Sequence, residues 1–128
     1  MTAQPVEPPS TSDLLRARYL DAVDAVEVAS NRTIAVLVTS QEARDIARAN
    51  VAAGRPMTEL ENMIEPHALR ASVSEALTEL ERTRHDAQRL LFQLLHSEGQ
   101  TMADIGRTWG ISRQLVSRLV NEPDPDTH

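Results

Sequence analysis

The residues with the clearest chemical pattern lie near the C-terminus, in residues 112–121. If this segment is a helix, its period of 3.6 residues places Val116 and Leu119 on one face. Arg can form two parallel hydrogen bonds with guanine and Gln with adenine, whereas Ser and Asn can bind bases or phosphate oxygens. Side chains of these types occupy the opposite face: Arg113, Gln114, Ser117, Arg118 and Asn121. This face could therefore read the edges of DNA bases.

A first short helix is predicted immediately before this segment. Thr101 can cap its start, and Asp104 lies three residues later, at the spacing of a capping box. Ile105 and Trp109 are four residues apart, so they share one face of this helix. Gly106 is small at the point where two helices have to approach each other closely.

A tight turn and a second helix follow. Gly110 tolerates the left-handed conformation that such a turn requires. Ile111 supplies a buried apolar residue inside the turn, and Ser112 can cap the second helix. Val116 and Leu119 would then pack back against the first helix. Residues 100–121 are therefore expected to form two short helices joined by a turn.

Residues 100–121, QTMADIGRTWGISRQLVSRLVN, resemble the helix-turn-helix of small bacterial DNA-binding regulators, of the kind found in resolvase C-termini and sigma-factor region 4. The resemblance implies that the second helix is the recognition helix, which enters the major groove of double-stranded DNA. It implies that Arg113, Gln114 and Ser117 face base edges, and that Arg118 contacts phosphate or a base further along. The remaining expected DNA-binding residues are Gln100, Thr101 and Arg107, which contact the backbone from the first helix, with Ser112 and Asn121 on the second.

The charge distribution singles out the same part of the chain. The net charge is −6, yet residues 82–121 carry six Arg and three acidic residues. All 13 basic residues are Arg, which fits either planar, bidentate contacts or a GC-rich genome. Phosphate neutralisation supplies much of the affinity for DNA, so an acidic monomer would bind weakly. Dimerisation would double the contacts, and we expect a homodimer.

Residues 66–98 predict a long connecting helix. Pro66 suits a first helical turn, and Gly99 can provide a left-handed cap after its end. Apolar and small residues alternate at spacings of four and three along it, which is heptad spacing. This seam either packs against residues 14–53 or forms a dimer interface. Its members are Leu69, Val73, Ala76, Leu80, Thr83, Ala87, Leu90 and Leu94.

Residues 12–65 predict an N-terminal helical region for dimerisation or partner binding. Ser12 can cap a helix that either continues through the β-branched run TIAVLV or breaks there. Thr39 and Glu42 have capping-box spacing, which predicts a new helix from Ser40 to Ala53, stopped by Gly54 and by Pro56 just beyond it.

The same spacing at Thr58 and Glu61 predicts a short helix that ends before Pro66. The terminal segments 1–11 and 122–128 are rich in proline and are expected to be disordered tails, the second of them acidic. The expected fold is all-α, with about five or six helices. It is a helical bundle in which a long helix leads into a helix-turn-helix at residues 99–121.

The remaining composition argues against an enzyme and against cofactors. Without cysteine there is no disulfide, thiolate metal site or cysteine nucleophile, and no nucleophile elbow or phosphate-binding glycine loop occurs. No apolar run reaches membrane-spanning length, so we expect a cytoplasmic protein at the nucleoid. Neither set of candidate ligands or catalysts has suitable spacing: the histidines His67, His85, His96 and His128, and the acids Glu59, Glu61 and Glu65.

The leading functional hypothesis is a sequence-specific bacterial transcription regulator, acting as a homodimer through its C-terminal helix-turn-helix. One alternative is an interaction module in which residues 12–97 bind a sigma factor, RNA polymerase or another regulator. A second alternative is a nucleoid-associated protein that binds DNA with little sequence preference.

Overall fold

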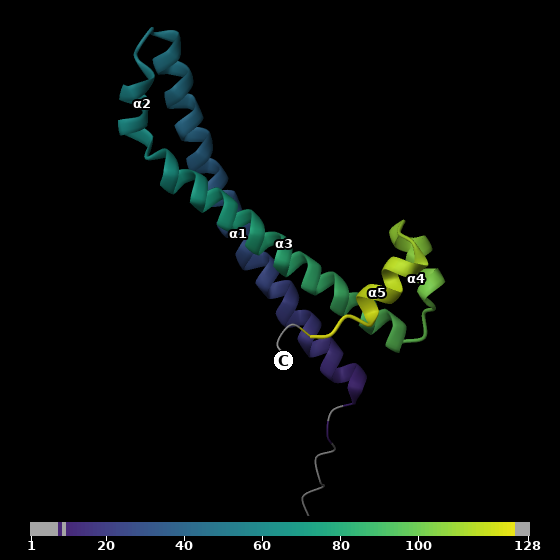
Figure 1. Ribbon diagram of the computed structural model, residues 1–128. Helices are drawn as coiled ribbons and strands as arrows, with labels where there is room; N and C mark the ends of the chain where they lie inside the picture. The colour runs from purple at the N-terminus through teal and green to yellow at the C-terminus, as the bar shows by residue number, and fades with distance from the viewer. Residues whose placement is uncertain (1–7, 9, 125–128) are drawn as a thin grey trace, which may run out of the picture. The chain divides into compact units, whose positions relative to one another are not determined.

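The computed structural model describes residues 8 and 10–124, and within them the chain is all-α (Figure 1). The described residues contain no strand, and none of their helices is both long and apolar enough to cross a membrane. The expected all-α fold, with a long helix leading into C-terminal helices, is confirmed. The five helices are α1 (Thr11–Ala52), α2 (Met57–Ile64), α3 (Pro66–Ser97), α4 (Met102–Trp109) and α5 (Arg113–Val120).

The chain divides into two compact units, to which α1 and α3 both contribute. The first comprises Met1–Asp24 and Arg84–His128, and we call it the HTH unit because it contains the predicted helix-turn-helix. The second comprises Ala25–Thr83, and we call it the hairpin unit. The tails were expected to be disordered, but residues 1–7, 9 and 125–128 lie outside the described part of the chain. For them the expectation stays a prediction.

Helix α1 is continuous over 42 residues, so the predicted new start at residue 40 is wrong. Thr39 does not cap a helix: its hydroxyl donates to the carbonyl of Ala35 at 3.2 Å, as in a helix interior. The β-branched run is tolerated because Thr33 and Val36 lie on the buried side of α1, where packing outweighs intrinsic propensity.

The start of α1 also differs from the prediction. Ser10, rather than Ser12, provides the cap: its Oγ accepts from the backbone N–H of Asp13 at 3.1 Å. The carboxylate of Asp13 accepts in return from the N–H of Ser10 at 3.4 Å. This reciprocal arrangement is a capping box with Asp in place of the usual Glu.

The buried side of α1 is a seam of mostly small residues at spacings of four and three. In the hairpin unit, the Thr33 hydroxyl donates to the carbonyl of Ala29 at 2.7 Å and contacts that of Ala76 on α3 at 3.3 Å. Small side chains let the two backbones approach closely enough for this contact. The seam comprises Leu15, Tyr19, Ala22, Val26, Ala29, Thr33, Val36, Ser40, Ala43, Ala47 and Asn50.

Helix α3 begins at Pro66, as predicted, and all eight predicted seam residues are buried or half-buried. Ala76 is only 1% exposed and lies opposite Thr33 of the same chain. Gly99 follows the helix with φ +106°, and the N–H of Gln100 donates to the carbonyl of Leu95 at 3.1 Å. The predicted glycine cap is therefore present as a Schellman motif.

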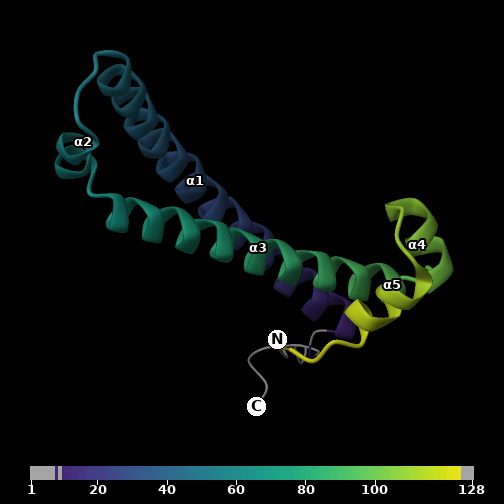
Figure 2. The same cartoon turned by 45° about the horizontal axis from the view of Figure 1, so that its top comes forward.

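Helix α2 lies in the connection from α1 to α3 (Figure 2). Gly54, with φ +74°, ends the first helix as predicted, and the short helix before Pro66 is confirmed. Its predicted capping box is wrong, because the N-cap is Pro56 and no side chain caps the helix. Thr58 already lies within the first turn, two residues past the cap position at Pro56.

Candidate nucleic-acid interface

The two short helices are held by a small apolar core that they share with the end of α3. Phe92, Ile105, Val116 and Leu119 are its buried members. Ile105 and Val116 are fully buried, as expected from their positions on the inner faces of α4 and α5. Partly buried residues pack around this core, including the turn residue Ile111. The predicted inner positions of Ile105, Val116 and Leu119 are therefore confirmed.

Phe92 is a member of this core that sequence reasoning missed. The last turns of α3 carry apolar residues on two sides: Leu90 and Leu94 belong to the seam, whereas Phe92 packs against the short helices. A helix that is apolar all round is buried on more than one side, and the run LLFQLL has this character. That run was the available signal.

Trp109 lies at the edge of the core rather than inside it. It was expected to share the inner face with Ile105, but it is 47% exposed. Its ring meets Phe92 edge-on, with the centroids 5.6 Å apart and the planes at 66°. This T-shaped geometry is favourable for two aromatic rings. Trp109 thus ties the end of α4 to α3 while one side faces solvent.

Both predicted helix caps of the motif are present. The Thr101 Oγ accepts from the N–H of Asp104 at 3.1 Å, and the Ser112 Oγ accepts from the N–H of Leu115 at 3.1 Å. Gly110 adopts φ +69°, which is the left-handed conformation expected in the turn. Two short helices joined by a glycine turn therefore position the candidate residues.

The outer face of α5 presents three exposed polar side chains: Arg113, Gln114 and Arg118. Within the described part of the chain, none of them forms a hydrogen bond or ion pair. Ser117 is half-buried, and its carbonyl accepts from Asn121 Nδ2 at 2.9 Å. The free donors of this face are thus concentrated in two guanidinium groups and one amide.

The N-terminal ends of α4 and α5 lie around one open hollow of about 660 Å³. Arg113 lines it together with Gln100 and Thr101, so the structure brings three candidate DNA-binding residues together. His96 also lines it, and its Nδ1 lies 3.1 Å from the carbonyl oxygen of Gln100. Helix N-termini favour anions, and this hollow combines the N-termini of α4 and α5 with the guanidinium of Arg113.

Arg107, the remaining candidate on α4, already has an anionic partner. Its guanidinium pairs with the carboxylate of Asp104, three residues earlier on the same helix. Hydrogen bonds from the Thr101 side chain and backbone, together with the charge of Arg107, hold the pKa of Asp104 below its usual range. Arg107 is therefore partly neutralised within α4, unlike Arg113 and Arg118 on α5.

The histidines take part in local polar contacts. His85 Nε2 lies 2.9 Å from a carboxylate oxygen of Glu122, and His96 contacts the Gln100 carbonyl. Among the residues that the structure describes, no group of three or more His, Asp or Glu side chains could hold a metal ion. His128 lies outside those residues.

The comparison with known families identifies the same region of the chain. Residues 86–122 match the family model described as MarR family, whose members are transcription regulators with a winged helix-turn-helix. The match covers less than a third of the chain and includes the end of α3, α4, the turn and α5. It supports a helix-turn-helix regulator, but not the finer likeness to resolvase C-termini or sigma-factor region 4. No curated protein and no solved structure matches the chain.

Proposed function

We propose that the protein is a sequence-specific transcription regulator that binds double-stranded DNA as a homodimer. The observation that carries this proposal is the outer face of α5. Arg113, Gln114 and Arg118 are exposed there, on a helix that its caps and apolar core hold in place. The family match to residues 86–122 supports a regulatory role for this same segment.

In this proposal α5 enters the major groove with its N-terminal end toward the bases. Arg113 and Gln114 lie in its first turn and make bidentate contacts with guanine and adenine. Ser117 faces the bases one turn later, and Arg118 contacts a phosphate or a base further along. Groups near the helix ends contact the DNA backbone: Gln100, Thr101, Arg107, Ser112 and Asn121.

A homodimer compensates for the acidic charge of the chain, because two recognition helices double the contacts with DNA. The hairpin unit offers a surface for this association. Ile34, Leu37 and Val38 are exposed on α1, and they lie within about 100° of one another around the helix axis. We assign this apolar stripe to contact with a second copy of the chain. The dimer would act at the nucleoid, in the bacterial cytoplasm.

The experiment that tests this function is a selection of fragmented bacterial genomic DNA with the purified protein. About 150 mM salt suppresses most non-specific phosphate binding. An enriched two-fold motif, with half-sites about one helical turn apart, is the expected result. Recovery of DNA without a common motif would instead support a low-specificity nucleoid protein. Failure to recover DNA would contradict both.

A second candidate function is protein binding through residues 12–97, with a sigma factor, RNA polymerase or another regulator as partner. The exposed stripe of Ile34, Leu37 and Val38 favours it, because such a stripe can also accept a partner helix. This alternative predicts that the protein shifts no DNA duplex even at low salt. It also predicts that a defined stoichiometric complex with the partner forms through the hairpin unit.

A further inference from the structure

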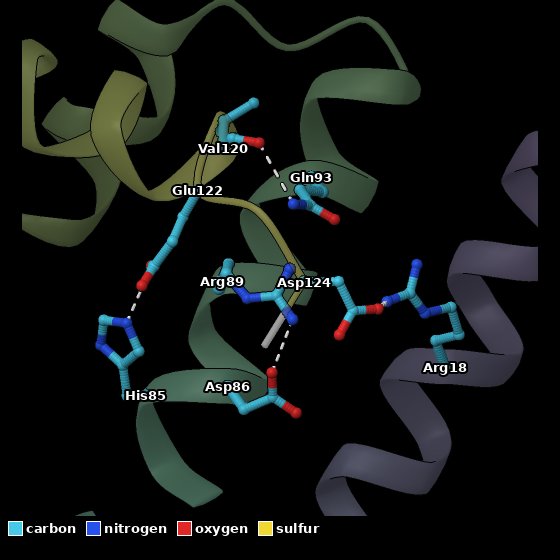
Figure 3. Close-up of polar contacts among 8 residues, drawn as sticks. All are labelled: Arg18, His85, Asp86, Arg89, Gln93, Val120, Glu122 and Asp124. Carbon is cyan, nitrogen blue, oxygen red and sulfur yellow. Dashed lines mark hydrogen bonds and ion pairs between the residues drawn. The ribbon is translucent and has the colours of Figure 1, made fainter. Parts of the chain in front are cut away.

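Two arginines near the start of α1 hold both ends of the helix-turn-helix. Arg16 pairs with the carboxylate of Glu98, which directly precedes the motif. Arg18 pairs with Asp124, which follows it (Figure 3). The two acids are separated by the whole motif, yet they reach positions two residues apart on one helix. The motif is thus attached at both ends to one short stretch of α1.

The two attachments approach α1 from different directions. Residues two positions apart on an α-helix are separated by about 200° around its axis. Arg16 and Arg18 therefore project to roughly opposite sides, and each reaches a different end of the motif. A connection at one end alone would leave the motif free to pivot around that point. Two connections on opposite sides restrict this rotation.

The segment after α5 is also attached to α3. Gln93 Nε2 donates to the carbonyl oxygen of Val120 at 3.1 Å, at the last turn of α5. His85 Nε2 lies 2.9 Å from the carboxylate of Glu122, as Figure 3 shows. Residues 120–124 therefore connect α5 to both long helices within the HTH unit. The acids of this segment are engaged with α1 and α3, although their composition alone predicted a disordered tail.

The small contribution of these ion pairs to folding stability indicates that their role lies elsewhere. Both arginines and their acidic partners are at least partly exposed, and exposed ion pairs add little to folding stability. The apolar core around Phe92 already holds the short helices together. Contacts that are weak but are spread over both ends of a rigid element restrict its orientation more than they stabilise its fold.

We propose that residues 120–124 form a strap which, together with the Arg16–Glu98 pair, fixes the direction in which α5 faces DNA. Arg16, Arg18, Glu98 and Asp124 are then positioning residues: they do not contact DNA, but they hold the helix that does. This proposal rests on the DNA-binding function proposed above. It adds that the orientation of the recognition helix depends on the start of α1.

The test uses distance measurements between two spin labels within the HTH unit. The chain has no cysteine, so Leu20→Cys on α1 and Thr108→Cys on α4 create unique labelling sites, both at exposed positions. Double electron–electron resonance then measures the distribution of distances between the two spin labels, one on α1 and one on α4. The unaltered strap is expected to give a narrow distribution, and Arg16→Glu/Arg18→Glu a broad one.

Two further variants separate the strap from general effects of charge. Adding Glu98→Arg and Asp124→Arg restores the net charge and both pairs with reversed polarity, and is expected to narrow the distribution again. Arg32→Glu/Arg44→Glu changes the net charge equally, in the hairpin unit, and should leave the distribution narrow. A distribution that stays narrow in Arg16→Glu/Arg18→Glu would overturn the strap. So would broadening that the added reversals do not correct.

DNA binding by the same variants tests the positioning role. If loosening the strap reduces the fraction of molecules in the binding-competent orientation to about a tenth, affinity for the selected DNA site falls about tenfold. The fourfold variant is expected to recover most of this loss. Equal losses in Arg16→Glu/Arg18→Glu and Arg32→Glu/Arg44→Glu would overturn positioning, because charge alone would then explain both. If even the unmodified protein binds no DNA, the proposed function fails, while the distance distributions still decide the strap.

Discussion

Gly106 on α4 lies directly against the backbone carbonyl of Ile111 in the turn. A Cβ atom at residue 106 would be 2.8 Å from that carbonyl oxygen, closer than real Cβ contacts come. The N–H of Ile111 donates to the carbonyl of Gly106 at 3.0 Å, so the two residues are fixed to each other. The glycine lets the turn pack onto the helix, which brings α5 into place.

Gly106→Ala is therefore expected to destabilise the protein, although alanine is normally the better helix former by about 1 kcal/mol. The clash is with backbone, which cannot rotate away, and overpacking of this kind costs about 1–3 kcal/mol. Urea denaturation measures the loss. Thr108→Ala, at an exposed position of the same helix, is the control and should change stability by less than about 0.5 kcal/mol. A more stable Gly106→Ala protein would show that this close approach is absent.

The cap of α4 should give stability a dependence on pH in the acid range. The pKa of Asp104 is lowered in the folded protein by the hydrogen bonds from Thr101 and the charge of Arg107. Its carboxylate therefore stabilises the fold above the ordinary Asp pKa, and this contribution is lost as pH falls through the lowered value. Asp104→Asn should be less stable at neutral pH, with the difference closing in acid. Denaturation across a pH series measures it, and a constant difference would contradict the argument.

The double substitution Arg113→Ala/Gln114→Ala is expected to abolish sequence preference while leaving the fold intact. Each bidentate base contact contributes about 1–3 kcal/mol of discrimination. Competition between the selected site and a scrambled duplex measures this preference, and circular dichroism checks the helix content. Asp45→Ala, an exposed position on α1, is a suitable control. Undiminished preference in the double variant would show that α5 is not the reading helix.

Arg118 can be assigned to phosphate or base by the salt dependence of binding. A phosphate contact releases counterions, so Arg118→Ala should reduce the slope of log K against log salt concentration by about 0.9. It should also weaken binding to specific and scrambled DNA alike. Titrations at several salt concentrations give the slope. An unchanged slope with relaxed preference at one base pair would assign Arg118 to a base instead.

The apolar stripe on α1 predicts how the oligomeric state responds to charge. Ile34→Glu/Val38→Glu places two carboxylates in the proposed contact between copies and is expected to give a monomer by sedimentation. Val28 provides a control outside the arc of the stripe: it is more exposed than Ile34, at 70% against 61%, and lies about 120° from Ile34 and about 80° from Val38 around the helix. Val28→Glu should leave the dimer intact. A monomeric unmodified protein, or equal effects of both changes, would contradict the assignment of this face.

The capping boxes at Thr101 and Thr39 show why one sequence pattern predicted a helix start correctly in one place and wrongly in another. Thr101 with Asp104 caps α4, and it follows the glycine motif that ends α3. Thr39 with Glu42 has the same spacing, but the seam continues through this region, and its packing keeps α1 helical. Local spacing therefore identifies a possible cap, whereas burial on both sides of it decides whether the helix starts there.

The candidate site was predictable to a similar extent. The core-facing positions of α4 and α5 follow from the helical period. The left-handed conformations of Gly99 and Gly110 follow from the turns after α3 and α4. Phe92 and the contacts of residues 120–124 did not follow, because they join segments far apart in the sequence. Gln93 contacting Val120 is an example: nothing in the local pattern of either residue indicates the other. Such contacts depend on the path of the chain, which the pattern of a single helix does not contain.

The position of Trp109 gives the HTH unit a spectroscopic signal of its own. It is the protein's one tryptophan, and its contact with Phe92 joins the short helices to α3. Its emission therefore reports on the HTH unit, whereas far-ultraviolet circular dichroism is dominated by the long helices. Coincident denaturation curves from the two signals would mean that both units melt as one cooperative body. A fluorescence transition at a lower denaturant concentration would mean that the short helices of the HTH unit can detach while the long helices persist.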